Sequence, residues 1–345
     1  MITVGILGLG GIGSTHARAL ASLAEAGVAV RLIAYSGGSA ALAADCGWPQ
    51  ARRLDPAELI TDPDVSVIAI CSPSGLHEEH ALAALAAGKH VVVEKPMAVS
   101  TAGATAVRDR AERSGLIVSP LAQRRFEPLN VALRQAISSG KLGRIVLGET
   151  FVHWYRHPDY YREAGWRAEA AGGGGSLMNQ GLHNVDLLCW LLGGVTRVTG
   201  LTATLGHDIA TEDTAVAALQ FTGGALGVVA TTTATPPGTP SELSIWTSTG
   251  SARIDQNGIR AWDFAAVPRP AEPDLAVTGA SDPAAIGISG HLAQWSDVLD
   301  AVITGRRPMI TADDGVATVS VLDGIYRAAA DGRTVSGTAG LEVGR

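Results

Sequence analysis

The stretch ITVGILGLGGIGSTHARALASLAEAG, residues 2–27, decides how the first part of the chain folds. Residues 2–7 are an apolar run rich in β-branched side chains, which is typical of a buried strand. Glycines follow at once in the order Gly8-Leu9-Gly10-Gly11-Ile12-Gly13, and the residues after them have helical spacing as far as Gly27. A strand, a glycine turn and a helix in this order predict the first βα unit of a dinucleotide-binding sheet.

The GxGxxG spacing has a physical reason at each glycine. Small residues permit the tight turn, the close approach of a pyrophosphate and the close packing of helix on strand. The N-terminus of the following helix presents unpaired N–H groups to the phosphates. We therefore expect a cofactor site at Gly8, Gly10, Gly11, Ile12 and Gly13. The alternative is a turn that serves packing alone.

Further apolar strands are expected at 28–36, 65–71, 90–94 and 116–122, with helical patterns between them. Continuous apolar strands alternating with helices indicate a parallel sheet covered on both faces. The sequence thus predicts an α/β protein whose residues 1–122 form a Rossmann domain.

The pattern changes after this domain. Longer strands are expected at 145–154, 196–205, 213–221, 225–233 and 243–248, and the segment AALQF-TGG-ALGVV indicates a hairpin. Residues 264–288 are expected to form a long loop, and two helices are expected near 290–304 and 312–331. Residues 123–345 are therefore predicted to form an α+β domain for substrate binding and oligomerisation, with a large, mostly antiparallel open sheet.

Composition limits the class of protein. The 345 residues carry a net charge of −7 without a basic run, which argues against nucleic acid or an anionic membrane as the partner. Three cysteines lie far apart without CxxC spacing, and no signal peptide or membrane-spanning stretch stands out. We expect a soluble cytoplasmic protein with a small-molecule substrate.

The choice between NAD and NADP depends on the end of the second strand. An acid that binds the adenosine ribose is usual there, but this chain has Ser36-Gly37-Gly38 and no carboxylate before Asp45. Ser36 could accommodate a 2′-phosphate, although no arginine is adjacent in sequence. The sequence favours an NAD(P) cofactor with a slight preference for NADP.

Two polar clusters are candidates for catalysis. In VVVEKPMAVS, residues 91–100, Lys95 follows a strand, at the edge of the sheet where ligands bind. Alternatively, Lys95 is a surface lysine and Glu94 is its ion-pair partner. In GGGGSLMNQGLHNVDLLCWLL, residues 172–192, helical spacing places Asn179, His183 and Asp186 on one face. His183 suits acid–base work near neutral pH; alternatively it is a core histidine bonded to Asp186.

Together the GxGxxG turn, the EKP motif and GGGxLxNxGxHxxD resemble the Gfo/Idh/MocA family of nicotinamide-dependent oxidoreductases. The resemblance runs nearly end to end and includes His16, SPSGLHEEHALAALAAGKHVVVEKP and HLAQWSDVLDAVITGRRP. It implies catalysis by Lys95 and His183, and dimers or tetramers formed through the open sheet. It also implies cofactor contacts from the strand ends, for which we expect Ser36, Ser72, Pro73, His77, Glu94 and Lys95.

One position departs from many family members, which carry Asp where this chain has Asn179. Because an amide cannot take a proton, we expect Asn179 to orient the substrate. Residues 151–166 are rich in aromatic and arginine side chains, which suits a sugar pocket or, alternatively, a subunit interface. Arg124, Tyr161 and Trp166 are the further substrate-binding candidates. His77 and His80, and His153 and His157, lack a convincing third ligand, so no metal site is expected.

These features predict an NAD(P)-dependent dehydrogenase or reductase acting on a secondary alcohol of a sugar, polyol or sugar derivative. One alternative is a glycosidase with retained NAD that oxidises a sugar carbon transiently and eliminates the glycoside. Another is a cofactor-sensing regulator. Regulators of this kind tend to lose the lysine or the histidine, whereas Lys95 and His183 are both present.

Overall fold

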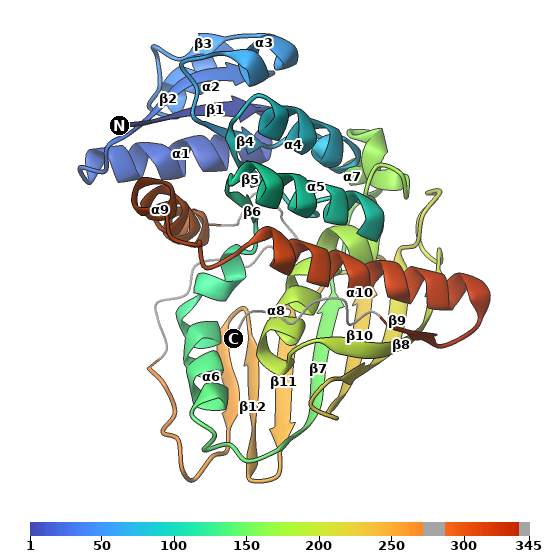
Figure 1. Cartoon of the computed structure of the whole chain (residues 1–345). Helices are drawn as coiled ribbons and strands as arrows, with labels where there is room; N and C mark the ends of the chain where they lie inside the picture. The colour runs from blue at the N-terminus through green and yellow to red at the C-terminus, as the bar shows by residue number, and fades with distance from the viewer. Residues whose placement is uncertain (272–286, 338–345) are drawn as a thin grey trace. The chain divides into compact units, whose positions relative to one another are not determined.

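A computed structural model of the chain describes residues 1–271 and 287–337. Its residues group into two compact units (Figure 1). The first unit contains Met1–Gln123 and Ile288–Val316, and the second contains Arg124–Gly287 and Ala317–Arg345. The expected division near residue 122 assigns everything from 123 onward to one domain, whereas residues 288–316 group with the first unit.

The first unit is built on six parallel strands in the order β3-β2-β1-β4-β5-β6. This order reverses direction between β1 and β4, as in doubly wound nucleotide-binding sheets. The strands are β1 (Ile2–Leu7), β2 (Val30–Ser36), β3 (Arg52–Arg53), β4 (Val67–Ile70), β5 (His90–Val93) and β6 (Val118–Pro120). The helices are α1 (Gly11–Glu25), α2 (Ala40–Asp45), α3 (Pro56–Thr61), α4 (His77–Ala86), α5 (Thr101–Ser114) and α9 (Ser289–Thr304).

The strands expected from sequence are largely buried in the core of this unit, whereas the short β3 is exposed. Side chains of β1, β2 and β4 pack with α1, and the cluster includes Trp295 and Val298 of α9. Helix α9 lies against α1. The segment Ile288–Val316 therefore completes the core of a sheet whose last strand ends at Pro120.

The second unit contains an eight-stranded sheet in the order β13-β12-β11-β7-β10-β9-β8-β14. All neighbouring pairs are antiparallel except β7 and β10, which confirms a mostly antiparallel sheet. The strands are β7 (Ile145–His153), β8 (Val195–Ala203), β9 (Thr214–Phe221), β10 (Leu226–Thr232), β11 (Glu242–Thr247), β12 (Gly250–Asp255), β13 (Gly258–Trp262) and β14 (Val335–Ser336).

Helices cover one face of this sheet. They are α6 (Pro128–Ser138) and α8 (Leu182–Leu192), which pack with residues of α10 (Ala312–Asp331) over a continuous apolar core. A short helix, α7 (Pro158–Arg162), follows β7. Strands β3, β12, β13 and β14 and helix α6 are among the elements that the sequence did not single out. Within the expected loop 264–288, residues 272–286 lie outside the described residues.

The described residues contain no helix that is both long and apolar enough to cross a bilayer.

Candidate active site

The glycine turn between β1 and α1 has two kinds of glycine. A Cβ on Gly8 would lie 2.7 Å from the carbonyl oxygen of Cys71, and a Cβ on Gly13 would lie 2.2 Å from that of Gly8, so packing requires glycine at both positions. Gly10 and Gly11 have no atom within 4 Å of an added Cβ. The start of α1 is therefore open to a ligand, and its uncapped N–H groups suit the pyrophosphate of a dinucleotide.

The end of β2 carries no acidic side chain. Ser36 is buried, and its carbonyl oxygen accepts hydrogen bonds from the backbone N–H groups of Gly8 and Leu9. Gly37 and Gly38 follow with φ of 69° and 61°, a conformation that favours glycine. On the neighbouring strand, Arg53 is paired with Tyr35 and is exposed, so a cation lies one register step from Ser36.

The loop after β4 is tied to the loop after β5 by a buried histidine. The ring nitrogens of His77 lie 2.8 Å from the carbonyl oxygen of Ser72 and 2.7 Å from that of Pro96. Burial lowers the pKa of His77, while the two carbonyl oxygens and the charge of Glu94 favour the protonated ring. Because both ring nitrogens face carbonyl oxygens, His77 links the two loops and has no nitrogen directed at a metal ion. Pro73 precedes the short 3-10 turn that leads into α4.

Glu94 and Lys95 follow β5 at the edge of the sheet that carries the glycine turn. Glu94 is 5% exposed, and its Oε2 accepts the backbone N–H of Lys95 at 3.1 Å. Its Oε1 lies 3.0 Å from Nε2 of His16. The side chain of Lys95 is half-buried, and the Lys95–Pro96 peptide is cis.

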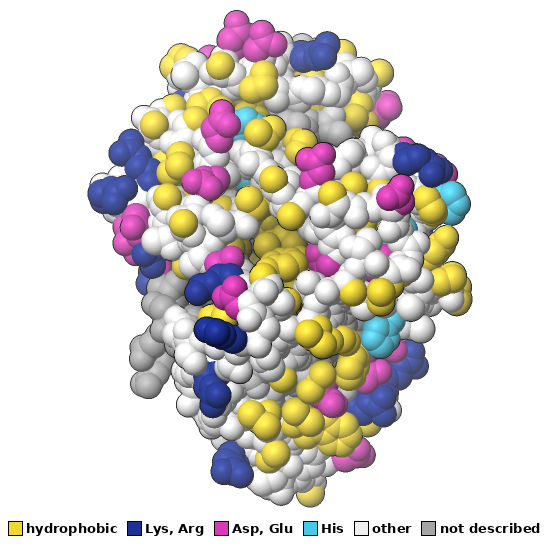
Figure 2. Space-filling view, turned by 90° about the vertical axis from the view of Figure 1, so that its right-hand side faces the viewer, with side chains coloured by type: hydrophobic (Ala, Val, Ile, Leu, Met, Phe, Trp, Pro, Cys, Tyr) yellow, Lys and Arg dark blue, Asp and Glu magenta, His cyan; other side chains and the backbone are white. Residues whose placement is uncertain are grey.

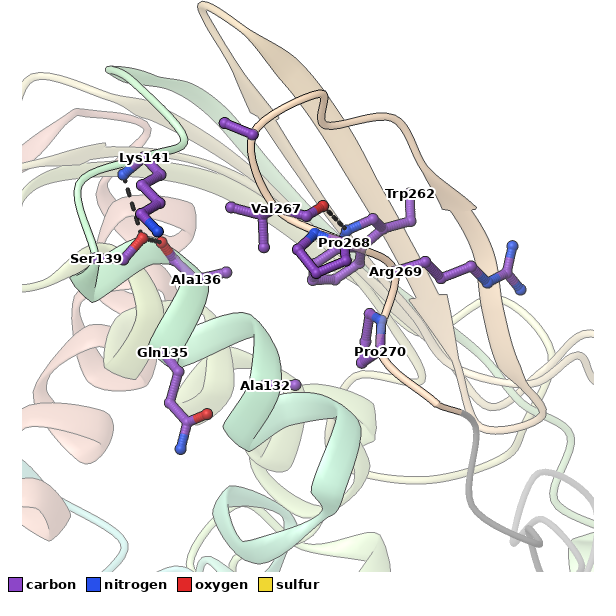
Figure 3. Close-up of a pocket in the computed structure, with 11 residues that line it drawn as sticks. Ala132, Gln135, Ala136, Ser139, Lys141, Trp262, Val267, Pro268, Arg269 and Pro270 are labelled. Carbon is purple, nitrogen blue, oxygen red and sulfur yellow. Dashed lines mark hydrogen bonds between the residues drawn. The ribbon is translucent and has the colours of Figure 1, made fainter.

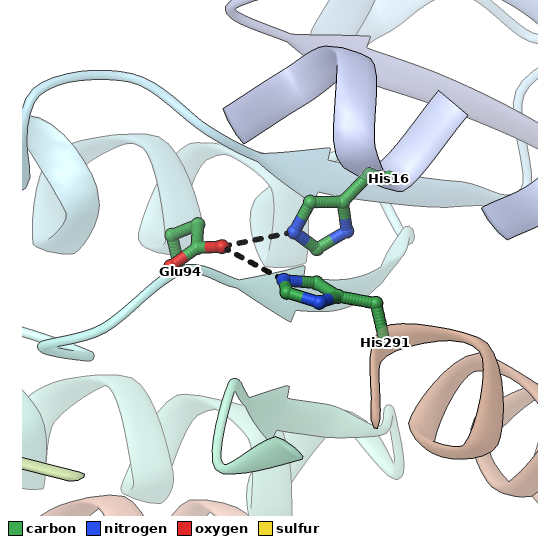
Figure 4. Close-up of side chains that lie close together, drawn as sticks. All are labelled: His16, Glu94 and His291. Carbon is green, nitrogen blue, oxygen red and sulfur yellow. Dashed lines mark hydrogen bonds and ion pairs between the residues drawn. The ribbon is translucent and has the colours of Figure 1, made fainter. Parts of the chain in front are cut away.

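The carboxylate of Glu94 lies in a cluster of buried imidazoles (Figure 4). Nε2 of His291 is 3.8 Å from Glu94 Oε1, and the rings of His16 and His291 meet edge to face. Burial raises the pKa of a carboxyl group, but here the neighbouring histidines hold the pKa of Glu94 well below its usual range. Burial lowers the pKa of His16. The expectations from sequence included neither His291 nor a contact between His16 and Glu94.

The predicted catalytic helix of the second unit does not begin as an α-helix. Residues Ser176–Gly181 form a π-helix, and α8 follows from Leu182. The α-helical spacing expected for Asn179, His183 and Asp186 therefore does not hold across this segment, because a π-helix has more residues per turn. Asn179 is buried and His183 is half-buried.

The glycine run before this helix is needed for packing. A Cβ on Gly172 or Gly174 would lie within 2.3 Å of the carbonyl oxygens of Trp166 or Arg167, and a Cβ on Gly175 would meet Glu212. Oε1 of Glu212 accepts the backbone N–H of Leu177 at 2.7 Å and so caps the π-helix. Burial raises the pKa of Glu212. Gly175 thus allows one buried carboxylate to reach the helix, and Gly172 and Gly174 allow the backbone at Trp166 and Arg167 to pack closely.

Tyr160 is a neighbour of the candidate site that the sequence did not single out. Its hydroxyl accepts Nδ2 of Asn179 at 3.4 Å and Nε2 of Gln180 at 3.1 Å. The guanidinium of Arg167 lies 4.1 Å from the centre of the Tyr160 ring. A tyrosine held over two amides offers a polar, aromatic surface of the kind that binds sugars.

The other predicted substrate residues lie in different surroundings. Tyr161 is 5% exposed, its hydroxyl lies 2.7 Å from that of Thr233, and burial raises its pKa to about 12. Trp166 is half-buried in a 3-10 turn. Arg124 donates to Asn184 and to Ser241, so it is already bonded within the second unit.

Asp186 binds a different partner from the one considered from sequence. Its carboxylate accepts two hydrogen bonds from Arg125, at 2.6 and 2.9 Å, and one from the hydroxyl of Thr318 at 2.9 Å. Both charged side chains are almost fully buried. This pair ties α8 to the chain before α6 and to α10.

A pocket of about 380 Å³ lies between α6 and the segment after β13 (Figure 3). Its wall includes Gln135 and Ala132 of α6 and Val267 and Pro268 opposite. None of the predicted site residues lines it, so it is separate from the candidate site.

Comparisons with known proteins agree with the fold. The NAD-binding Rossmann model of an oxidoreductase family matches residues 2–121, and the GFO/IDH/MocA C-terminal domain matches residues 130–253. The crystal structure of the WlbA dehydrogenase from Bordetella pertussis, in complex with NADH and UDP-GlcNAcA, is 30% identical. It covers 97% of this chain and 98% of its own, with a TM-score of 0.85.

Two curated relatives are similar over shorter stretches. Inositol 2-dehydrogenase 2 of Saccharopolyspora erythraea is 32% identical over 197 residues, which are 56% of this chain and 54% of the relative. The scyllo-inositol 2-dehydrogenase (NADP(+)) IolW of Bacillus subtilis is 33% identical over 153 residues, 44% of this chain and 42% of the relative. The chain therefore matches about half of the length of these curated relatives.

The buried Arg125–Asp186 pair leads to a prediction about stability. Asp186→Asn leaves a buried guanidinium without its counter-charge, so we expect a loss of about 3–5 kcal/mol in the free energy of unfolding measured with urea. Asp159→Asn, which removes an exposed partner of Arg162, is the matched control and should change the midpoint little. Equal losses for the two variants would contradict this account of the pair.

Proposed function

Because the chain belongs to the Gfo/Idh/MocA family of oxidoreductases, we propose that it transfers a hydride between a secondary alcohol and the nicotinamide of NAD(P). The proposed substrate is a sugar, a polyol or a sugar derivative, as the names of the similar proteins suggest. One observation carries the proposal. Lys95 follows β5 at the same carboxyl edge of the parallel sheet as the open glycine turn after β1.

Each polar side chain has a role in this proposal. The nicotinamide, when bound, would supply the hydride acceptor or donor. His183 would accept the hydroxyl proton during oxidation and return it during reduction. Lys95 would polarise the substrate oxygen, and the amide of Asn179 would orient a neighbouring hydroxyl.

The first experiment is a turnover screen with NAD⁺ and NADP⁺ against inositols, aldoses, sugar acids, UDP-sugars and glycosides. We expect one substrate class to produce reduced nicotinamide. Lys95→Met and His183→Ala should each lower kcat by at least about 100-fold while the cofactor still binds, because general acid–base groups contribute on that scale. Absorbance follows the reduced cofactor, and fluorescence titration measures cofactor binding.

The matched control is an exposed lysine. Lys141→Met should leave turnover unchanged. Unchanged turnover in Lys95→Met and His183→Ala would overturn the assignment of these residues. Glycoside cleavage without accumulation of reduced cofactor would replace the dehydrogenase by the oxidise–eliminate–reduce reaction. Cofactor binding without reaction on any substrate would favour a cofactor-sensing regulator.

We also propose that the cofactor is NADP. The end of β2 lacks the usual carboxylate, and Arg53 on the adjacent strand provides an exposed cation one register step from Ser36. A guanidinium is well suited to bind the 2′-phosphate that distinguishes NADP from NAD. Arg52, its neighbour, is already paired with Asp62.

Replacement of this cation should therefore change cofactor preference. We expect Arg53→Ser to raise KM for NADP⁺ about tenfold, which corresponds to about 1.4 kcal/mol of lost binding, and to leave KM for NAD⁺ nearly unchanged. Arg31→Ser, at the opposite end of β2, is the control. A native protein that prefers NAD⁺, or equal changes for the two cofactors, would contradict the proposal.

The outer face of the second sheet supports a homo-oligomer. Leu201 pairs with Val216, which pairs with Ala230 of β10, so these residues share a face. Leu226 and Trp246 fall on the same face because each is paired with Leu147. The four large side chains are 38–68% exposed, and one view of the molecule shows many hydrophobic side chains in its lower part (Figure 2). We propose that a second copy of the chain covers this face.

Charges placed on this face should separate the subunits. We expect the native protein to sediment as a dimer or tetramer and the double variant Val216→Lys and Leu226→Lys to sediment as a monomer. Leu205→Lys, at an exposed leucine in the loop after β8, should remain associated. A native monomer at micromolar concentration would overturn the proposal.

A further inference from the structure

The main chain on both sides of the Lys95 side chain is held by buried groups. Oε2 of Glu94 accepts the N–H of Lys95 at 3.1 Å, and Nδ1 of His77 lies 2.7 Å from the carbonyl oxygen of Pro96. Glu94 and His77 are 5% and 1% exposed. The first contact holds the peptide before Lys95, and the second holds the carbonyl group of the residue after it, so together they constrain the direction in which the lysine side chain leaves the main chain.

Trp295 determines how His16 meets Glu94. The indole N–H of Trp295 donates to Nδ1 of His16 at 2.9 Å, and an indole nitrogen can only donate. Nδ1 must therefore keep its lone pair, which places the proton of the neutral ring on Nε2. That N–H is directed at Oε1 of Glu94, 3.0 Å away. The histidine is thus fixed in the tautomer that donates to the carboxylate.

The three side chains come from three separate elements. His16 lies on α1, Glu94 directly follows β5, and Trp295 lies on α9. His16 and Trp295 are each no more than 1% exposed, so water does not compete for these bonds. Each oxygen of Glu94 has its own donor: Oε1 faces His16, and Oε2 faces the backbone of Lys95.

Metal binding is the alternative role for His16, Glu94 and His291, since their ligand atoms lie within 4.8 Å of one another. The hydrogen bonds do not fit it. A histidine that binds a metal usually donates its other ring N–H to an acceptor, whereas Nδ1 of His16 accepts from Trp295. Metal binding through Nε2 would require an imidazolate. His291 therefore lies beside Glu94 as a neighbour at 3.8 Å and not as a co-ligand.

We infer that Trp295, His16 and Glu94 form a positioning relay that fixes the main chain at Lys95 and thereby the direction of its ammonium group. The relay acts through hydrogen bonds in one order: Trp295 donates to His16, His16 donates to Glu94, and Glu94 accepts from the Lys95 backbone. This inference rests on the proposed role of Lys95 in hydride transfer. His16 and Trp295 are positioning residues, since Glu94 and the Lys95 backbone separate them from the reacting lysine.

The sequence offers a sharp test of the relay at His16. Glutamine carries a carbonyl acceptor and an NH2 donor on one carbon, so His16→Gln offers an acceptor to Trp295 and a donor to Glu94. His16→Leu can do neither. We expect His16→Gln to keep kcat within about threefold of the native value and His16→Leu to lower kcat about 100-fold, with cofactor affinity retained, because small misplacements of reacting groups cost rates of this order.

A second pair of variants separates positioning from packing. Trp295→Phe removes the N–H that sets the tautomer of His16 and keeps an aromatic ring. Trp48→Phe removes a similar bond, since Trp48 donates to the carbonyl oxygen of Ala17 on the same helix at 2.9 Å. Trp295→Phe should lower kcat, whereas Trp48→Phe should not, although both lose one indole hydrogen bond to α1.

The lysine itself can be observed directly, because the chain has three lysines, Lys89, Lys95 and Lys141. NMR of protein labelled with ¹³C and ¹⁵N at lysine side chains gives three sets of signals, which Lys95→Arg and Lys141→Arg assign. We expect the signal and the titration midpoint of Lys95 to move in His16→Leu and Trp295→Phe. They should stay in place in His16→Gln and Trp48→Phe, and the signal of Lys141 should stay in all variants.

Each outcome decides the inference. Equal effects of His16→Gln and His16→Leu, or a Lys95 signal that never moves, overturn the relay. A stoichiometric metal in the purified protein that disappears in His16→Gln replaces the relay by a metal centre. Absence of turnover in the native protein would overturn the proposed function, and the lysine spectra would still decide the relay. If His16→Leu does not fold, the two tryptophan variants give the answer.

Discussion

The negative charge of Glu94 has to be satisfied by protein groups, because a side chain that is 5% exposed has little access to water. An unpaired buried carboxylate would cost several kcal/mol, so each of its oxygens needs a donor. The donors come from α1 and from the backbone of Lys95, and α9 supplies the indole that orients His16. These hydrogen bonds join α1, α9 and the end of β5 within the first unit.

The second unit also contains buried carboxylates that are hydrogen-bonded by protein groups. Glu212 is buried and binds the backbone at the start of the π-helix, together with the hydroxyl groups of Thr211 and Tyr326. Arg125 and Asp186 anchor α8 a few residues further on. Asn179 and His183 therefore lie on a segment fixed near both ends by buried carboxylates, a rigidity that the roles proposed for them require.

Local pattern was enough to predict the parallel sheet, the glycine turn and the hairpin of β9 and β10, because each is encoded by neighbouring residues. The partners of the buried charges could not be predicted in this way. His291 and Glu94 are nearly 200 residues apart, and nothing in the sequence near Asp186 points to Arg125. The π-helix was also missed, since helical spacing in sequence does not distinguish it from an α-helix.

The position of Arg53 is a further example. No basic residue follows Ser36 in sequence, yet the pairing of β2 with β3 places Arg53 beside Tyr35, the residue before Ser36. The glycine run 172–175 also had a reason that sequence did not reveal, the close approach of Glu212 and of the turn at Trp166. The sequence indicated which segments carry the candidate site, and tertiary contacts determine which partner each side chain has.

The first unit is discontinuous, and this limits how the protein can be recombined. All six strands of its sheet are complete by residue 120, but Trp295 and His291 arrive with α9 after a long excursion of the chain. A hybrid made by one crossover near residue 122 would combine Glu94 and His16 with an α9 from another protein. Exchange of cofactor-binding units between relatives would therefore require two crossovers, or co-adaptation of α9 with the helix and strand that it contacts.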